Sequence, residues 1–192
     1  MRLPTDFSHH RATLDSISNH YVREGAGEPL LLLHGWPGFR WEWHRNIGPL
    51  ARDFDVIVPD MRGFGESDKP PFDQIDLYHM DRAVEDTRIL LDRLGLTRAY
   101  LVGHDFGAVL AHKFLRRYPE RVAKTLIANP IVPGLDELYL SPWNDLDRTI
   151  SAVPVLFLQG MADVCIPSRW SDLVTRWYTN FSIEYVPDRG TS

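Results

Sequence analysis

The chain has 192 residues, of which 44% are hydrophobic, and it carries a formal net charge of -5 at pH 7. This length can bury the core of one domain, and the acidic balance argues against a nucleic-acid-binding protein, which normally presents a basic face. A single cysteine, Cys165, excludes a disulfide within the chain and fits a reducing cytoplasm. No apolar stretch has the length of a signal-peptide core or a membrane span. We therefore expect one cytoplasmic domain over residues 1–192.

The first sixty residues predict three strands, a helix and a fourth strand. Alternating residues at 12–17 and the stretch 20–23 predict two paired strands, and the glycines at 25–28 predict a turn. The leucine run at 30–33 is typical of a strand that is buried on both faces. A helix at 40–52 and a buried strand at 56–58 follow.

The helix over 81–94 has the clearest pattern in the chain. Its apolar positions repeat at helical spacing, and Gly95 stands where helices commonly end. The stripe consists of Met80, Ala83, Val84, Thr87, Leu90, Leu91 and Leu94. The remaining predicted elements are strands at 97–102, 123–128, 153–158 and 181–186 and helices at 108–117 and 168–178. This alternation predicts an α/β fold with a twisted, mostly parallel sheet and helices on both faces.

The most informative motif is Gly103-His104-Asp105-Phe106-Gly107, which lies between a predicted strand and a predicted helix. This arrangement is typical of the nucleophile elbow of a hydrolase, with an aspartate in place of the usual serine. An aspartate is ionised at neutral pH and can attack an electrophilic carbon directly, which forms an ester. A base is then needed mainly to hydrolyse that ester. The alternative is an aspartate that only caps the following helix.

Two further loops follow buried strands and predict the rest of a catalytic site. The turn at 34–38 would present the Trp36 amide, which together with the Phe106 amide would form an oxyanion hole. The alternative, a turn demanded by glycine and proline, is compatible with this role. Asp163 follows the nucleophile in chain order, as a triad acid does, or else is an ordinary turn aspartate. We expect substrate-pocket positions at His34, Gly35, Pro37 and His104.

Three motifs together resemble the α/β hydrolases, and among them the bacterial soluble epoxide hydrolases. They are His34-Gly35-Trp36-Pro37-Gly38, the segment from Arg62 to Pro70, and the aspartate elbow. The resemblance covers about residues 6–130 and resumes at about residue 143. Haloalkane dehalogenases share the aspartate elbow but usually place a tryptophan after the nucleophile, so Phe106 favours the epoxide hydrolases.

The resemblance implies that Asp105 opens a small-molecule epoxide and that Asp163 orients a catalytic histidine. It implies that no cofactor is needed. Trp36 and Phe106 would supply the oxyanion-hole amides. No pair of histidines has metal-ligand spacing along the chain, so the sequence also predicts no metal.

The chain departs from this family in two places. Residues 131–150 are too few for the helical cap that carries the family's proton-donating tyrosines, although Tyr139 lies among them. Thr191 stands where the catalytic histidine is expected, no histidine follows His112, and the family's final helix is missing. We therefore expect a capless core in which an ester can form but lacks a base for its hydrolysis.

Two other interpretations remain open at this stage. Without a cap, an apolar floor around Trp36, Phe106 and Ile131 would be exposed and could serve a non-catalytic protein for partner binding or self-association. The chain could also be the truncated product of an epoxide hydrolase gene.

Overall fold

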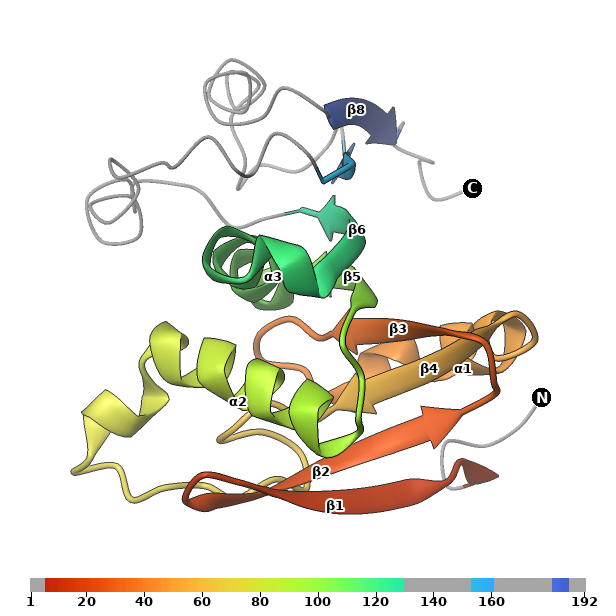
Figure 1. Cartoon of the computed structure of the whole chain (residues 1–192). Coiled ribbons are helices and arrows are strands. Elements are labelled where there is room, and N and C mark those ends of the chain that lie inside the picture. The colour runs from red at the N-terminus through yellow and green to blue at the C-terminus, as the bar shows by residue number, and fades with distance from the viewer. Residues whose placement is uncertain (1–5, 130–152, 161–180, 187–192) are drawn as a thin grey trace, which may run out of the picture.

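The computed structural model describes residues 6–129, 153–160 and 181–186. They form an eight-stranded sheet in the order β1-β2-β4-β3-β5-β6-β7-β8 (Figure 1). The strands are β1 (His9–Leu14), β2 (Ile17–Glu24), β3 (Glu28–Leu33), β4 (Phe54–Pro59), β5 (Ala99–His104), β6 (Val122–Ala128), β7 (Val155–Gly160) and β8 (Phe181–Val186). The helices are α1 (His44–Leu50), α2 (Met80–Arg93) and α3 (Phe106–Arg117), with 3-10 turns η2 (Arg40–Trp43), η3 (Ile75–Tyr78) and η4 (Pro119–Arg121).

All strand pairs from β4 to β8 are parallel, whereas β1 pairs with β2 and β2 pairs with β4 in antiparallel fashion. The sheet is therefore mixed and mostly parallel, as predicted. The carboxyl ends of parallel strands lie along one edge of a sheet, where ligand sites of α/β proteins gather. This edge carries the residues that follow β3, β4 and β5.

The leucine run of β3 is buried on both faces, as its sequence predicts. Leu31 and Leu33 pack in one core with residues of α2 and α3, while Leu30 and Leu32 pack in a second core with Ile47 of α1. Successive side chains of a strand point to opposite faces, so one continuous apolar run serves two layers of helices. The helices thus cover both faces of the sheet.

The N-terminal hairpin corrects one prediction. The proposed strand at 12–17 contains the turn itself, because β1 ends at Leu14, β2 begins at Ile17, and Leu14 pairs with Ile17. Asp15 has a φ of 51°, in the left-handed region that aspartate tolerates better than most residues. The alternation of apolar and polar residues correctly predicts strand structure here. Because the alternation continues across residues 15–16, it does not reveal the turn between the two strands.

The helix predictions are mostly confirmed. Helix α2 ends close to its predicted end, and Gly95 has a φ of 70° with its amide bonded to the Asp92 carbonyl. The predicted helix at 40–52 is divided into η2 and the short helix α1. The predicted helix at 168–178 and the segment 131–150, where the cap would lie, fall outside the described residues.

The start of α3 packs directly against the end of β3. A Cβ on Gly107 would lie 2.2 Å from the Leu33 carbonyl oxygen, and a Cβ on Gly103 would lie 2.3 Å from the Gly107 carbonyl oxygen. Both neighbours are backbone atoms, which cannot rotate away as a side chain can. The two glycines of the elbow are therefore required by close backbone approach.

Replacement of Gly107 by alanine is expected to destabilise the fold by about 1–3 kcal/mol, because the added methyl group overpacks a rigid backbone contact. Gly48→Ala is the matched control, since a Cβ there meets nothing within 4 Å and Gly48 lies in α1. That variant is expected to be neutral or more stable by about 0.5–1 kcal/mol. Urea denaturation measures both, and equal stabilities of the two variants would contradict this account of the elbow.

Candidate active site

Asp105 lies in the sharp turn between β5 and α3. Its φ of 53° and ψ of -116° are unusual for a residue with a side chain. The turn is held by the Asp105 amide, which donates to the Ala128 carbonyl oxygen of β6 at 3.0 Å. This conformation places the aspartate at the carboxyl edge of the sheet and at the N-terminus of α3, where a negative charge is favoured.

One oxygen of the Asp105 carboxylate accepts two backbone hydrogen bonds. The Trp36 amide donates to Oδ1 at 2.8 Å, and the Phe106 amide donates to the same atom at 2.6 Å. The structure therefore brings together the three residues that the sequence placed in the nucleophile elbow and the oxyanion hole. Asp105 is also the N-cap of α3, so the capping interpretation and the elbow describe the same residue.

The other oxygen, Oδ2, accepts no hydrogen bond from the residues that the structure describes. All eight histidines of the chain lie within those residues, and none of them is hydrogen-bonded to the Asp105 carboxylate. Asp163, Thr191 and Tyr139 lie outside them. Within the described part of the chain, the arrangement is thus a carboxylate anchored through one of its two oxygens.

His34 holds the turn that carries Trp36. Its Nδ1 donates to the Gly35 carbonyl oxygen at 2.9 Å, and its Nε2 accepts from the Met61 amide at 3.0 Å. Burial lowers the pKa of His34, which keeps the imidazole neutral and suited to donate at one nitrogen and accept at the other. Because the side chain has no exposed surface, it acts on the site through the turn and not as a wall of a pocket.

The other predicted pocket positions surround the carboxylate in different ways. A Cβ on Gly35 would lie 2.8 Å from the Asp105 Cβ, so glycine is needed for the approach of the turn. Pro37 is exposed, and the Trp36 side chain is 66% exposed beside the site. An exposed tryptophan next to the Asp105 carboxylate offers apolar contact area to a ligand or to another protein. Self-association over this surface remains a prediction.

Glu42 is a site residue that the sequence did not reveal. Its Oε1 accepts from His104 Nδ1 at 2.7 Å, and its Oε2 accepts from the Gly35 amide at 2.8 Å. Glu42 thereby links the residue before Asp105 to the residue before Trp36. The glutamate lies within a tryptophan-rich stretch that predicts only a helix, so no motif marks it as part of the site.

The pKa of Glu42 lies below its usual value. Burial is the largest single influence and raises the pKa, but the hydrogen bonds from His104 and from the Gly35 amide together outweigh it. Glu42 is therefore held as a carboxylate that fixes both loops of the site.

Comparison with known protein families places the chain in one of them. Residues 28–180 match the alpha/beta hydrolase fold family. The chain belongs to this family, which is the class that the sheet, the elbow and the adjacent amides define.

Among characterised proteins, the chain resembles epoxide hydrolases. It is 38% identical over 135 residues to the soluble epoxide hydrolase of Corynebacterium sp. (strain C12), which covers 69% of this chain and 45% of that protein. It is 34% identical over 141 residues to a cis-3-alkyl-4-alkyloxetan-2-one decarboxylase of Shewanella oneidensis, covering 71% of this chain and 44% of that protein. The chain thus spans less than half the length of these two relatives.

The structural comparison supports the same fold. The crystal structure of the Bacillus megaterium epoxide hydrolase in complex with an inhibitor matches with a TM-score of 0.77 at 21% identity, over 92% of this chain and 91% of that chain. Among the residues that the structure describes, no helix is long and apolar enough to cross a membrane.

The stability contributed by Glu42 is expected to depend on pH. Because the pKa is lower in the folded than in the unfolded chain, the contribution is complete above about pH 4.5 and is lost as the pH falls through the folded pKa. Glu42→Gln should remove this part of the acid sensitivity, measured by urea denaturation across that pH range. Glu28→Gln, at an exposed glutamate of β3, should leave it unchanged. Parallel pH profiles for the wild-type protein and Glu42→Gln would contradict the assignment.

Proposed function

We propose that the chain carries the nucleophilic half of an epoxide hydrolase, with Asp105 as the residue that is alkylated. The observation that supports this most strongly is the binding of one carboxylate oxygen by two amides. Trp36 and Phe106 hold Oδ1 at 2.8 and 2.6 Å, so the carboxylate cannot rotate freely and Oδ2 is the oxygen left to attack. Fixing a nucleophile in this way lowers the entropy that the reaction must lose.

In the first step, an electron pair on Asp105 Oδ2 forms a bond to one epoxide carbon. The bond between that carbon and the epoxide oxygen breaks, and its electron pair remains on the oxygen as an alkoxide. A proton must then be supplied to the alkoxide. The product is an alkyl ester of Asp105, in which Oδ1 is the carbonyl oxygen.

In the second step, water adds to the ester carbon, and negative charge develops on Oδ1. The two amides that hold Oδ1 in the free protein are then in place to stabilise that charge. The same pair of hydrogen bonds therefore serves the anchored nucleophile first and the tetrahedral intermediate later. A base is still needed to take a proton from the water. Collapse of the intermediate then breaks the bond between Cγ and Oδ2, so the diol leaves with Oδ2 and a proton, and the oxygen of the water completes the restored carboxylate.

Glu42 and His104 support this reaction indirectly, because they hold the loops that carry the two amides. Glu42 connects the Gly35 amide to the His104 ring, so it holds together the two loops from which the Trp36 and Phe106 amides emerge. We assign both as positioning residues. His104 is engaged by Glu42 and is not bonded to the Asp105 carboxylate within the described residues, so it is not the base in this proposal.

Ester formation needs only the Asp105 carboxylate and a proton donor, whereas ester hydrolysis also needs a base. The resemblance would assign the acid to cap tyrosines and the base to a histidine oriented by Asp163. Loss of a positioned acid or base costs roughly two to four powers of ten in rate. We therefore propose slow alkylation of Asp105 followed by still slower hydrolysis, which would make the chain a single-turnover protein.

Incubation of the protein with styrene oxide is expected to add the mass of one epoxide molecule, with Asp105 as the modified residue. Intact-protein mass spectrometry measures the addition, and peptide mapping locates it. Asp105→Asn should remain unmodified at this position, whereas Asp73→Asn, at an exposed aspartate, should be modified like the wild-type protein. Circular dichroism confirms that both variants are folded.

Two results would contradict the proposal. Modification that is equal in the wild-type protein and Asp105→Asn would show that Asp105 is not the nucleophile, and sustained diol formation would exclude a single turnover. A cis-3,4-dialkyloxetan-2-one is tested in parallel, because one relative carries that substrate class in its name. A chain that reacts with the lactone and not with the epoxide would overturn the epoxide assignment.

A further inference from the structure

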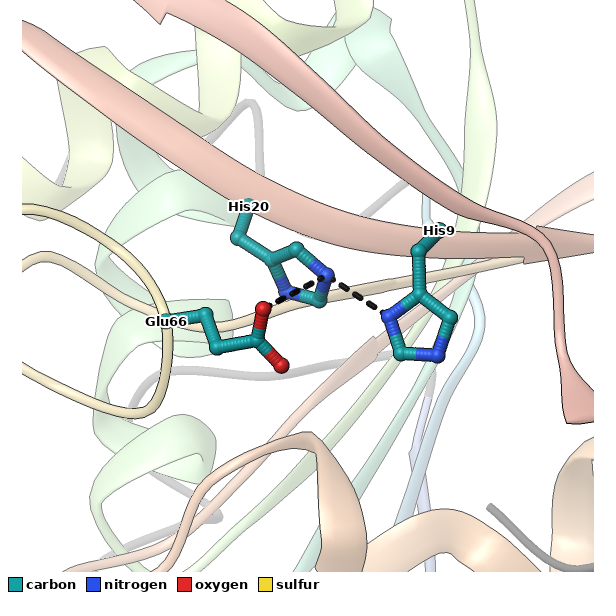
Figure 2. A group of neighbouring side chains, drawn as sticks. All are labelled: His9, His20 and Glu66. Atoms are coloured by element: carbon teal, nitrogen blue, oxygen red, sulfur yellow. Dashed lines mark hydrogen bonds and ion pairs between the residues drawn. The ribbon is translucent and has the colours of Figure 1, made fainter. Parts of the chain in front are cut away.

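Two histidines and a glutamate gather at the N-terminal hairpin, away from Asp105. Figure 2 shows His9 and His20 pointing toward each other from β1 and β2, with Glu66 approaching from the loop after β4. One ligand atom from each of the three side chains lies within 4.8 Å of the other two. We propose that His9, His20 and Glu66 bind a divalent transition metal ion of the zinc type.

The hairpin register brings the two histidines to one face. His9 pairs with Val22 and His20 pairs with Arg11, so the histidines are diagonal neighbours on the same side of the β1-β2 ribbon. His10 and Tyr21 point to the opposite side, where their rings stack at 5.2 Å. A separation of eleven positions along the chain hides this pairing, which is why the sequence predicted no metal.

The buried carboxylate of Asp60 fixes the orientation of His20. His20 Nδ1 donates to Asp60 Oδ2 at 2.9 Å, which leaves the lone pair of Nε2 directed at the cluster. Metal-binding histidines typically donate their second nitrogen to a carboxylate in this way.

Arg40 fixes the orientation of Glu66. Its Nη2 binds Glu66 Oε1 at 2.5 Å, and Oε2 then lies 3.9 Å from His20 Nε2. Its Nη1 binds Asp60 Oδ2 at 2.8 Å, so one guanidinium is balanced by two carboxylates. The two carboxylates outnumber the guanidinium of Arg40, and Arg11, the cross-strand partner of His20, is a further cation on this face of the hairpin.

Two of the three distances between ligand atoms can be compared with those of a tetrahedral site. His9 Nδ1 and His20 Nε2 are 2.9 Å apart, and the second pair of ligand atoms is 3.9 Å apart. Zinc bonds of about 2.0–2.1 Å in tetrahedral geometry separate ligand atoms by roughly 3.3 Å, between these two values. Side-chain rotations would have to bring these two distances, and the His9–Glu66 pair that lies within 4.8 Å, to the tetrahedral value.

Access and coordination number also suit such an ion. His9 is exposed, and the Glu66 side chain is 50% exposed, so an ion from solvent can reach the site. Three protein ligands leave a fourth position for water. The bound ion would join the hairpin to the loop after β4. Without an ion, the 2.9 Å distance between His9 and His20 is a hydrogen bond between the two rings. A metal titration distinguishes this hydrogen-bonded pair from a metal site.

Titration of the full chain with Co²⁺ is expected to produce the visible absorption of a tetrahedral cobalt centre at one ion per chain. Zn²⁺ should displace the cobalt and raise the melting temperature. His9→Ala and Glu66→Gln change exposed ligands and should each weaken binding at least tenfold. His10→Ala, on the opposite face of the same strand, should bind like the wild-type protein. Cys165 is present in every variant, so any contribution from its thiol is equal.

Absence of saturable binding in the wild-type protein would overturn the proposal and leave the two histidines as a hydrogen-bonded pair. Equal affinity in the wild-type protein and His9→Ala would overturn it as well. Alkylation of Asp105 is measured with and without a chelator and should be the same in both, because the metal takes no part in that reaction. Failure of the metal proposal and failure of the proposed function are therefore distinguishable.

Discussion

The close approach of α3 to the end of β3 is the constraint on which the site depends. Gly107 allows the first turn of the helix to lie against the Leu33 carbonyl, and Gly103 allows the elbow to close on Gly107. Asp105 between them takes a left-handed backbone conformation, with a φ of 53°. Because the helix starts there, its first amide and the Trp36 amide of the neighbouring loop both reach the same carboxylate oxygen.

The fully buried carboxylate of Asp60 organises the loops behind this site. Asp60 accepts hydrogen bonds from the His20 ring, from the backbone and side chain of Arg40, and from the Glu66 amide. A Cβ on Gly65 would lie 2.2 Å from the Asp60 Cγ, so this loop folds closely around the carboxylate. A buried charge is costly unless it is paired and hydrogen-bonded, and Asp60 is compensated by segments from three parts of the chain. The same residue therefore supports both the turn that precedes η2 and the proposed metal ligands.

The proposed chemistry and the family assignment rest on different observations. Membership of the alpha/beta hydrolase fold family follows from the match over residues 28–180, and many activities share that fold. The choice of an alkylation reaction follows from an aspartate whose one oxygen is bound by two amides. The relatives include an epoxide hydrolase and an oxetanone decarboxylase at similar identity. Sequence identity therefore does not select between an epoxide and a lactone as the substrate, and the reaction of each with Asp105 has to be measured.

Sequence patterns alone were enough to predict the class of fold, the buried strand β3, the helix α2 and the elbow with its aspartate. These features depend on local patterns: apolar periodicity, glycine spacing and the order of strand and helix. The sequence also placed the Trp36 and Phe106 amides beside Asp105, because the hydrolase fold presents its elbow next to the loop after the neighbouring strand. It misplaced the turn of the N-terminal hairpin, since alternation continues through Asp15.

Contacts between segments that no motif connects became visible only in the folded chain. Glu42 joins His104 to the Gly35 amide, and His9 meets His20 and Glu66, across separations that depend on strand register and loop packing. A shift of one residue in a strand turns every side chain to the other face, so such pairs cannot be deduced without the register. Sequence patterns indicate which residues are buried and where turns lie. A site made of side chains that are distant in sequence forms only when the sheet has fixed their relative positions.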